Sequence, residues 1–215
     1  MYPLMKIVAP MLGVRFMNLG YWPSTSEDDR KLIKFMDDAD DLEEYESDRS
    51  HIHLYEKAMS MHPKYPNFQD LEVLEVSCGQ GYSLEWIERW HVLNVEAAHL
   101  YSDFRKFVKE VSRVLRSGGT FCYVDVRYPH DAYLVNEIAE SFGFILQHFE
   151  DCTEEVVEGL NYSARKYDDL LERAPFFVQL FKKSLRETYC APGTDGYERL
   201  KSGQKMYVAA SWMKN

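Results

Sequence analysis

The stretch Leu71–Trp90, LEVLEVSCGQGYSLEWIERW, constrains the fold more than any other part of the chain. It predicts a short apolar strand, then a glycine turn at Cys78-Gly79-Gln80-Gly81, then a helix that begins near Ser83. Glycine suits such a turn because a Cβ would block tight chain reversal and close approach of the backbone to a ligand. In α/β proteins this arrangement holds nucleotide-like ligands at a helix N-terminus. An ordinary strand-to-helix turn without a ligand is the alternative interpretation.

The remaining pattern predicts an α/β protein. The expected strands cover residues 71–76, 92–95, 120–126, 144–149 and 205–212. The expected helices cover residues 48–60, 83–90, 102–115, 134–142, 154–160, 165–173 and 176–188, and a turn is expected at 193–196. Strands that alternate with helices imply a mostly parallel, Rossmann-like sheet with helices on both faces. We therefore expect an α/β domain over residues 71–215, preceded by a helical N-terminal cap over residues 1–70.

Charge and length limit the classes of partner. The 215 residues suffice for one sizeable domain with a hydrophobic core. A net charge of −10 argues against a nucleic-acid backbone or an anionic membrane surface as the main partner. Much of that charge is local, because Ser24–Arg49 carries eleven acidic and four basic residues. The rest of the chain is nearly neutral, which leaves room for an acidic ligand elsewhere.

Cysteine usage and hydropathy predict a cytoplasmic protein. The four cysteines lie far apart and have no zinc-binding spacing, so we expect reduced thiols and no metal site; they are Cys78, Cys122, Cys152 and Cys190. No apolar run approaches the roughly 18 residues of a transmembrane helix. We therefore expect no transmembrane segment.

Three segments resemble the class I S-adenosylmethionine-dependent methyltransferases, in the branch that includes sterol and small-lipid methyltransferases. Val73–Gly81, VLEVSCGQG, looks like the family's first motif, with Ser77 where glycine is common. Phe104–Gly119, FRKFVKEVSRVLRSGG, looks like the helix and Gly-Gly turn before the family's fifth strand. Asn18–Trp22 is similar to the N-terminal segment that often closes over the cofactor.

The resemblance implies S-adenosylmethionine as the cofactor and assigns residues to it. The glycine turn would wrap the methionine part of the cofactor, and Glu75 would support the turn or accept a hydrogen bond from the ligand's ammonium group. Asn94 would lie at the end of strand four, beside the reacting methyl group. Tyr21 and Trp22 would stack on the cofactor, with core packing as the alternative. The implied cofactor-binding set is Glu75, Ser77, Cys78, Gly79, Gln80, Gly81, Asn94, Tyr21 and Trp22.

The chain departs from the family after the first predicted helix. The family normally has two more strand–helix units there, which carry the acid that holds the ribose and the residues that hold adenine. In this chain only His91 separates Trp90 from Val92. We therefore expect a sheet with fewer strands, an incomplete domain, and a first strand exposed at the sheet edge. A splice form, a deletion and an error in the gene model would all produce this gap.

Two residues after the strand 92–95 are candidates for catalysis. By resemblance Glu96 follows strand four beside the methyl group; by spacing alone it could instead be the ribose-binding acid of a dinucleotide fold. His99 is the best placed of the seven histidines to act as a general base. The apolar stripe of Phe176, Phe177, Leu180 and Phe181 fits either a substrate pocket or the core. His51 and His53 are expected to be ordinary surface residues.

The function that the sequence predicts is methyl transfer from S-adenosylmethionine to a small, lipid-like acceptor such as a lipid or sterol. A catalytically inactive, methyltransferase-like variant that binds a partner is the first alternative, because the ribose and adenine segment is missing. A nicotinamide-dependent protein is the second alternative, and the lack of a third motif glycine at Ser83 or Leu84 weighs against it. The acceptor, the methylated atom and the oligomeric state stay open.

Overall fold

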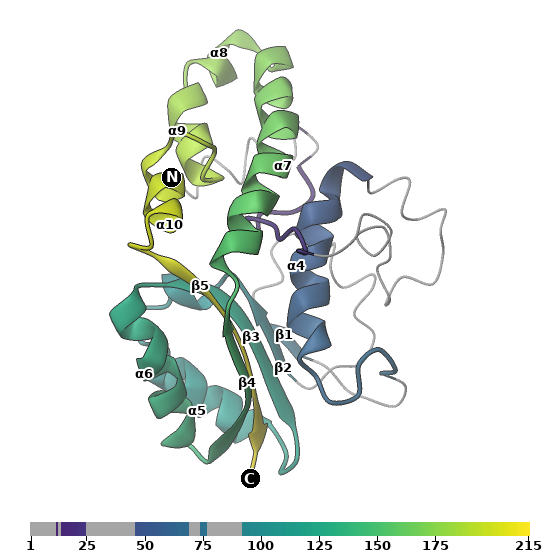
Figure 1. Cartoon of the computed structure of the whole chain (residues 1–215), viewed down its shortest axis with the longest axis vertical. Helices are drawn as coiled ribbons and strands as arrows, with labels where there is room; N and C mark the ends of the chain where they lie inside the picture. Colours follow the sequence, from purple (N-terminus) through teal and green to yellow (C-terminus); the bar gives the residue numbers. More distant parts are fainter. Residues whose placement is uncertain (1–11, 13, 25–45, 69–73, 77–91) are drawn as a thin grey trace.

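A computed structural model describes residues 12, 14–24, 46–68, 74–76 and 92–215 (Figure 1). The glycine turn at 77–81 and the helix predicted at 83–90 lie outside these residues.

One sheet of five strands forms the centre of the described fold. Its spatial order is β1-β2-β3-β5-β4, with β1 to β3 parallel and β5 antiparallel to both β3 and β4. Among the described residues β1 pairs with β2 alone, as expected for a first strand at the sheet edge. The strands are β1 (Leu74–Val76), β2 (Val92–Val95), β3 (Thr120–Arg127), β4 (Phe144–Asp151) and β5 (Met206–Lys214).

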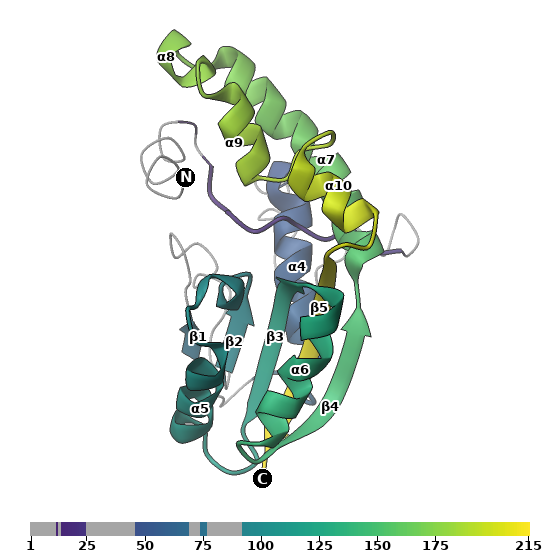
Figure 2. The same ribbon diagram turned by 90° about the vertical axis from the view of Figure 1, so that its left-hand side faces the viewer.

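Helices cover both faces of the sheet (Figures 1 and 2). α5 (Phe104–Val114) and α6 (Pro129–Glu140) cover one face, and α4 (Arg49–Ser60) and α7 (Thr153–Arg173) cover the other. Asp103 caps α5 by accepting a 2.8 Å hydrogen bond from the Lys106 N–H, which satisfies a donor at the helix start. This arrangement confirms the predicted α/β class with helices on both faces.

The remaining helices are short. Two 3-10 turns, η1 (Glu46–Asp48) and η3 (Ala98–Leu100), precede α4 and α5. After α7 the chain forms α8 (Phe176–Gln179), α9 (Lys182–Thr188) and α10 (Asp195–Lys201). In Figure 1, α7 rises from the sheet, α8 lies at the top and α9 returns towards the body. None of the described helices is both long enough and apolar enough to cross a lipid bilayer.

Successive strand residues alternate between two separate cores, because side chains in a strand point to opposite faces in turn. In β3, Phe121 and Tyr123 pack under α5 and α6, while Cys122 and Val124 pack against α4 and α7. All four side chains are fully buried. Burial on both faces explains why residues 121–124 of β3 are all apolar rather than alternating with polar residues.

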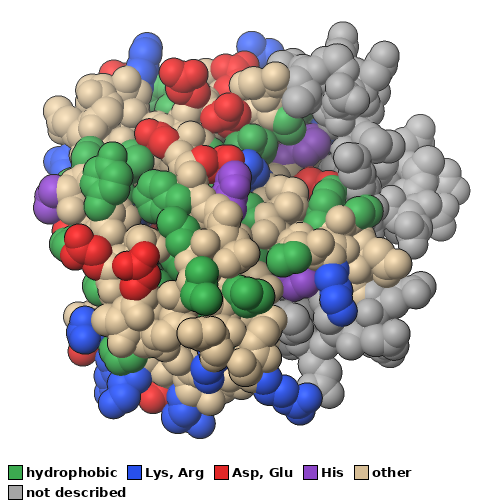
Figure 3. Space-filling view, turned by 60° about the horizontal axis from the view of Figure 1, so that its bottom comes forward, with side chains coloured by type: hydrophobic (Ala, Val, Ile, Leu, Met, Phe, Trp, Pro, Cys, Tyr) green, Lys and Arg blue, Asp and Glu red, His purple; other side chains and the backbone are tan. Residues whose placement is uncertain are grey.

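Surface charge is distributed unevenly over the molecule. On the face shown in Figure 3, lysine and arginine side chains gather along the lower margin, and most acidic side chains lie above them. The net charge of −10 therefore does not describe every part of the surface.

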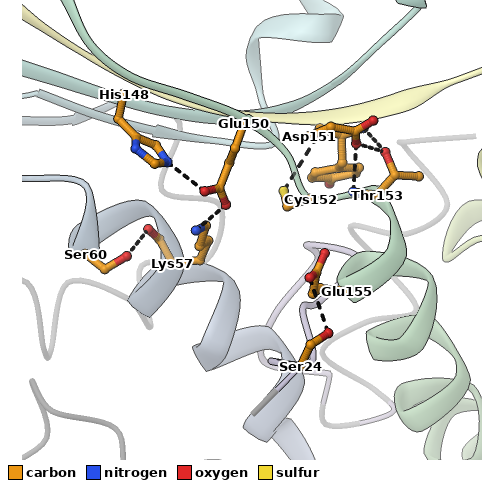
Figure 4. A network of polar contacts seen from close by, with 10 residues as sticks. Ser24, Lys57, Ser60, His148, Glu150, Asp151, Cys152, Thr153 and Glu155 are labelled. Carbon is orange, nitrogen blue, oxygen red and sulfur yellow. Dashed lines mark hydrogen bonds and ion pairs between the residues drawn. The ribbon is translucent and has the colours of Figure 1, made fainter.

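Polar contacts tie α4 and α7 to the sheet edge at β4 (Figure 4). Glu150 of β4 pairs with both Lys57 of α4 and His148. Asp151 accepts hydrogen bonds from the N–H and hydroxyl groups of Thr153, at the first residue of α7. These contacts join the end of β4 to α4 and α7, the two helices that cover the same face of the sheet.

Several predicted boundaries differ from the structure. The pieces expected at 154–160 and 165–173 form one helix, α7. Pro175 then stops α7 at Arg173, since a proline disfavours helical backbone in the preceding residue. The helix expected at 176–188 is divided into α8 and α9, and the turn expected at 193–196 includes Thr194, which caps α10.

Two predictions about burial were wrong. His51 and His53 were expected at the surface but are 1% and 2% exposed, because α4 packs against both the sheet and α7. The stripe of Phe176, Phe177, Leu180 and Phe181 forms neither core nor cavity wall; all four side chains are exposed on α8 and its junction with α9. Helical periodicity identified the stripe, but the short helices turn it outwards.

Candidate functional site

Glu96 and His99 lie together at the carboxyl end of β2. The Glu96 N–H donates to the Val124 carbonyl at 2.8 Å, which extends the pairing of β2 with β3 by one residue. Glu96 then adopts a positive φ of 49°, a conformation that non-glycine residues rarely occupy. Such backbone strain costs on the order of 1–3 kcal/mol and is concentrated at functional sites. It turns the chain sharply into η3, which carries His99.

Asp125 of β3 holds His99 in place. Its carboxylate accepts a 2.6 Å hydrogen bond from His99 Nδ1 and a 2.9 Å bond from the His99 backbone N–H. The Asp125 side chain is fully buried, whereas 31% of the His99 side chain is exposed. A carboxylate can only accept, so Nδ1 carries the proton and the lone pair lies on Nε2. This is the arrangement of an oriented general base.

Burial and neighbouring charge shift the protonation of both candidates. Burial raises the pKa of Glu96 to about 7, although the nearby Tyr207 hydroxyl and the Leu19 N–H oppose the shift. Burial alone would lower the pKa of His99, but the hydrogen bond and charge of Asp125 outweigh it and raise the pKa. Two titratable groups with perturbed pKa values at a strand end are typical of a catalytic site.

Both residues border a cavity of about 210 Å³. Its walls come from the N-terminal segment and from α7, α9 and α10. Most lining side chains are apolar, and Lys205 is the basic residue among them. The lining includes Leu12, Val14, Phe16, Leu19, Val126, Leu170, Leu171, Leu185 and Leu200. An apolar pocket with a few polar groups, at the carboxyl edge of parallel strands, is the usual form of a small-molecule site in this fold class.

The N-terminal segment Asn18–Tyr21, here called the strap, passes between α4 and α7 and closes one side of this site. The Leu19 N–H donates to Glu96 Oε1 at 2.7 Å. Two glycines permit the close passage: Gly20 has a φ of +87°, and a Cβ on Gly159 of α7 would lie 2.7 Å from the Tyr21 nitrogen. The strap is therefore fixed on the carboxyl group of Glu96 by backbone contacts.

A buried polar cluster supports the strap from below. His51 Nδ1 lies 2.9 Å from Asn18 Oδ1, and its Nε2 lies 2.8 Å from the Tyr167 hydroxyl. Burial lowers the pKa of His51 to about 4, so the ring is neutral near pH 7. Sequence analysis missed this cluster. The near-helical spacing of apolar residues in α4 was visible, but the contact with Tyr167 spans 116 residues.

The predicted cofactor residues are only partly described. Ser77, Cys78, Gly79, Gln80 and Gly81 lie outside the described residues. Asn94 is fully buried in β2 and lies opposite Val76, the last residue of β1 before that turn. Its Nδ2 donates to the Val76 carbonyl at 3.5 Å, while its buried Oδ1 has no hydrogen-bond partner among the described residues. An unpaired buried acceptor beside the turn fits a cofactor that donates a hydrogen bond there.

Glu75, Tyr21 and Trp22 are tied to the protein itself. Glu75 accepts a 3.2 Å hydrogen bond from the Tyr55 hydroxyl of α4. The Trp22 ring stacks on Tyr162 at 4.1 Å between ring centroids, and the Tyr21 N–H donates to Ser50 at 2.8 Å. Neither Tyr21 nor Trp22 lines the cavity. Their stacking on a cofactor stays a prediction.

Sequence comparison relates the chain to lipid-modifying enzymes of mycobacteria. It is 35% identical to phthiotriol/phenolphthiotriol dimycocerosates methyltransferase of Mycobacterium tuberculosis over 119 residues, 54% of this chain and 42% of that protein. The matched stretch thus spans less than half of that relative. The enzyme of the same name from Mycobacterium leprae is 25% identical over 262 positions, covering 100% of this chain and 90% of that protein. This alignment has more positions than the chain has residues, so it contains gaps on the side of this chain.

Solved structures share the fold. The cyclopropane synthase MmaA2 of Mycobacterium tuberculosis superposes with a TM-score of 0.58 at 10% identity, over 78% of this chain and 85% of that one. The mycolic acid cyclopropane synthase CmaA1, complexed with SAH and CTAB, gives the same TM-score at 12% identity and the same coverage. No protein-family model matches the chain. In sequence the chain is therefore similar to mycobacterial methyltransferases, and in fold to enzymes solved with S-adenosylmethionine-type ligands.

Proposed function

We propose that this protein transfers a methyl group from S-adenosylmethionine to a hydroxyl group of a small, lipid-like acceptor. The observation that carries the proposal is the His99–Asp125 pair, which borders an apolar cavity at the carboxyl end of β2 and β3. The names of the relatives support a lipid-like acceptor, since they are methyltransferases of phthiotriol and phenolphthiotriol dimycocerosates.

When bound, S-adenosylmethionine supplies an electrophilic methyl group on a positively charged sulfur. Asn94 and Glu75, with the turn 77–81 between the two strands that carry them, are the residues that would hold it. Asn94 would offer its Oδ1, which has no hydrogen-bond partner among the described residues. The sequence predicts a turn and helix start after β1, and backbone N–H groups at helix starts bind carboxylates.

His99 handles the proton of the acceptor. His99 Nε2 would take the proton of the acceptor hydroxyl, which would leave that oxygen free to receive the methyl group released from the cofactor's sulfur, and the Asp125 carboxylate would stabilise the imidazolium that forms. The proton then leaves to water from the exposed part of the ring. Removing a positioned general base typically costs about 10²–10⁴ in rate. Asp125 is a positioning residue in this scheme, because it acts through His99.

Glu96 and the strap orient the acceptor and exclude water. With a pKa of about 7, Glu96 carries a proton in a substantial fraction of molecules near neutral pH and can then donate a hydrogen bond to the acceptor oxygen. The strap, part of the proposed N-terminal cap, covers this carboxyl group through Leu19. Proximity and orientation of this kind can contribute several kcal/mol to a displacement reaction, on the order of 7–11 kcal/mol at best.

The cavity volume limits what enters. About 210 Å³ is less than the roughly 300–1,000 Å³ of pockets that enclose drug-sized ligands. Only the reacting part of a long-chain acceptor therefore fits beside His99, and the remaining chain extends outwards between the helices. We place this reaction in the cytoplasm, where the thiols of Cys122 and Cys152 stay reduced.

The test combines cofactor binding with the pH dependence of methyl transfer. Calorimetry should give a micromolar dissociation constant for S-adenosylmethionine, and Gly79→Asp should abolish binding. Because Asp125 raises the pKa of His99 and the base must be neutral, the rate should rise with pH through a midpoint above about 6.5. Asp125→Asn should move that midpoint to lower pH and reduce the maximal rate.

His130→Asn is the matched control, since His130 also lies beside an aspartate, Asp131, but with a side chain that is 77% exposed. It should leave both the rate and the midpoint unchanged. A His99→Ala variant with the full rate would contradict the proposed base. Absence of any heat of binding would instead support the inactive variant as the function of this chain.

A further inference from the structure

The upper end of the molecule carries exposed aromatic and aliphatic side chains. We call Phe176, Phe177, Leu180 and Phe181 the tip patch; their exposed fractions are 76%, 55%, 67% and 49%. They lie on α8 and at its junction with α9, the part that projects furthest beyond α7 in Figures 1 and 2. Contiguous apolar groups of this size on a protein surface mark interaction sites.

A small hydrophobic core lies beneath the tip patch. Val178 and Leu185 are 2% exposed and pack with Leu171 and Ala174 in a small core of their own. The Gln179 side chain donates to the Ala174 carbonyl at 2.8 Å, which holds α8 on the end of α7. The exposed side chains are therefore presented by an ordered support that buries the neighbouring apolar residues.

Basic residues surround the tip patch in a protein that is acidic overall. Arg173 precedes α8, and Lys182 and Lys183 begin α9. Arg173 and Lys183 are exposed, and Lys182 lies 3.5 Å from Glu172 at the surface. Aromatic and leucine side chains bordered by lysine and arginine are the pattern of surfaces that bind anionic lipid headgroups.

The same helices connect the tip patch to the proposed acceptor site. The cavity that Glu96 and His99 border is also lined by Leu170 and Leu171 of α7, Leu185 of α9 and Tyr189, which directly follows α9. The helices that carry the tip patch therefore also form part of the wall of the proposed acceptor site.

We propose that the α8–α9 tip docks on the surface of an anionic lipid bilayer and inserts the tip patch into it. A second copy of the chain is a poorer occupant. A fully buried aromatic residue contributes about 150–250 Å², so these partly exposed side chains offer on the order of 500 Å², below the roughly 800 Å² per partner of a stable complex. A bilayer does not need a complementary protein surface, and its anionic headgroups carry the charge opposite to that of the lysines.

Vesicle co-sedimentation tests the proposal on the full chain, without S-adenosylmethionine. The wild type should bind phosphatidylcholine vesicles that contain phosphatidylglycerol, and bind pure phosphatidylcholine more weakly. The double substitution Phe176→Ser with Leu180→Ser should weaken binding roughly tenfold or more, because it removes apolar groups that would enter the bilayer. Lys182→Glu with Lys183→Glu should weaken binding to the anionic vesicles and remove its salt dependence.

Tyr133→Ser with Leu134→Ser is the matched control, since these α6 side chains are 68% and 45% exposed but lie away from the tip. It should bind like the wild type. Failure of the wild type to bind anionic vesicles, or equal binding by the tip variant, would overturn the proposal. A dimer in light scattering that the tip substitutions dissolve, without vesicle binding, would assign the patch to a second copy instead. His99→Ala should bind vesicles normally, so this result is separate from that on methyl transfer.

Discussion

The cores on the two faces of the sheet differ in the polarity of their buried side chains. Under α5 and α6 the core is apolar and aromatic, with Phe121 stacked on Trp212 at 5.4 Å between ring centroids. Under α4 and α7 the structure buries polar side chains, among them Asn18, Ser50, His51 and His53, and leaves room for the cavity. Buried polar groups stabilise only when they are fully paired, so the second face gives up stability to position the strap and the site. The clustered apolar and aromatic side chains of the first face supply stability.

The largest expected effect comes from the apolar face. Trp212→Ala should lower the free energy of unfolding by about 3–5 kcal/mol, because it removes a fully buried ring and leaves a cavity that neighbours fill only partly. Urea denaturation measures the loss. S-adenosylmethionine binding by the fraction that stays folded should be unchanged.

Tyr133→Ala provides the comparison for this substitution, since that aromatic ring is 68% exposed on α6. Its effect should stay within about 0.5 kcal/mol, as for most surface substitutions. Equal losses for the two variants would mean that the apolar face does not supply stability in the way we describe.

The next effect is a pH dependence specific to the polar face. The pKa of His51 is about 4 in the folded protein and about 6.5 in the unfolded chain, so the unfolded state binds more protons between these values. Stability from the neutral ring is present above pH 6.5 and is lost as the pH falls towards 4, by about 3 kcal/mol. The stability difference between the wild type and His51→Gln should shrink by that amount over this window.

Glu96 should give the opposite sign. The pKa of Glu96 is about 7 in the folded protein and about 4.5 in the unfolded chain, so the folded state binds more protons between these values. Its contribution is present below pH 4.5 and is lost as the pH rises towards 7. Glu96→Gln should therefore reduce the loss of folding stability that accompanies rising pH. His51→Gln should reduce the loss of folding stability that accompanies falling pH. Parallel pH profiles for both variants would contradict the assignment of either group.

The smallest expected effect concerns the close passage of the strap. Gly159→Ala places a Cβ where the Tyr21 nitrogen and Gly20 carbon now lie, so the strap must shift. Overpacking of this kind costs about 1–3 kcal/mol. The shift should also weaken the contact between Leu19 and Glu96, and hence raise the KM for the acceptor. Arg165→Ala, at an exposed position of α7, should change neither the stability nor the KM by a measurable amount.

Sequence predicted the local structure around the candidate site correctly, while the catalytic roles of its residues stay predictions. Glu96 and His99 follow a strand whose bounds were predicted as observed, Val92–Val95, and both border the cavity. Asp125 was missed, although it lies near the end of the neighbouring parallel strand, and the carboxyl ends of parallel strands meet at one edge. That placement was the signal that could have paired it with His99.

The sequence by itself determined the elements and their order, because apolar periodicity, helix caps, glycine and proline act within a few residues of each other. It also indicated the motifs that relate this chain to methyltransferases. Only the tertiary structure decided that His51 is buried and that Phe176 is exposed, since both residues lie in helices with apolar neighbours and differ in what packs against them. Burial and hydrogen-bond partners depend on contacts between residues distant in the chain, and no short stretch of sequence specifies those.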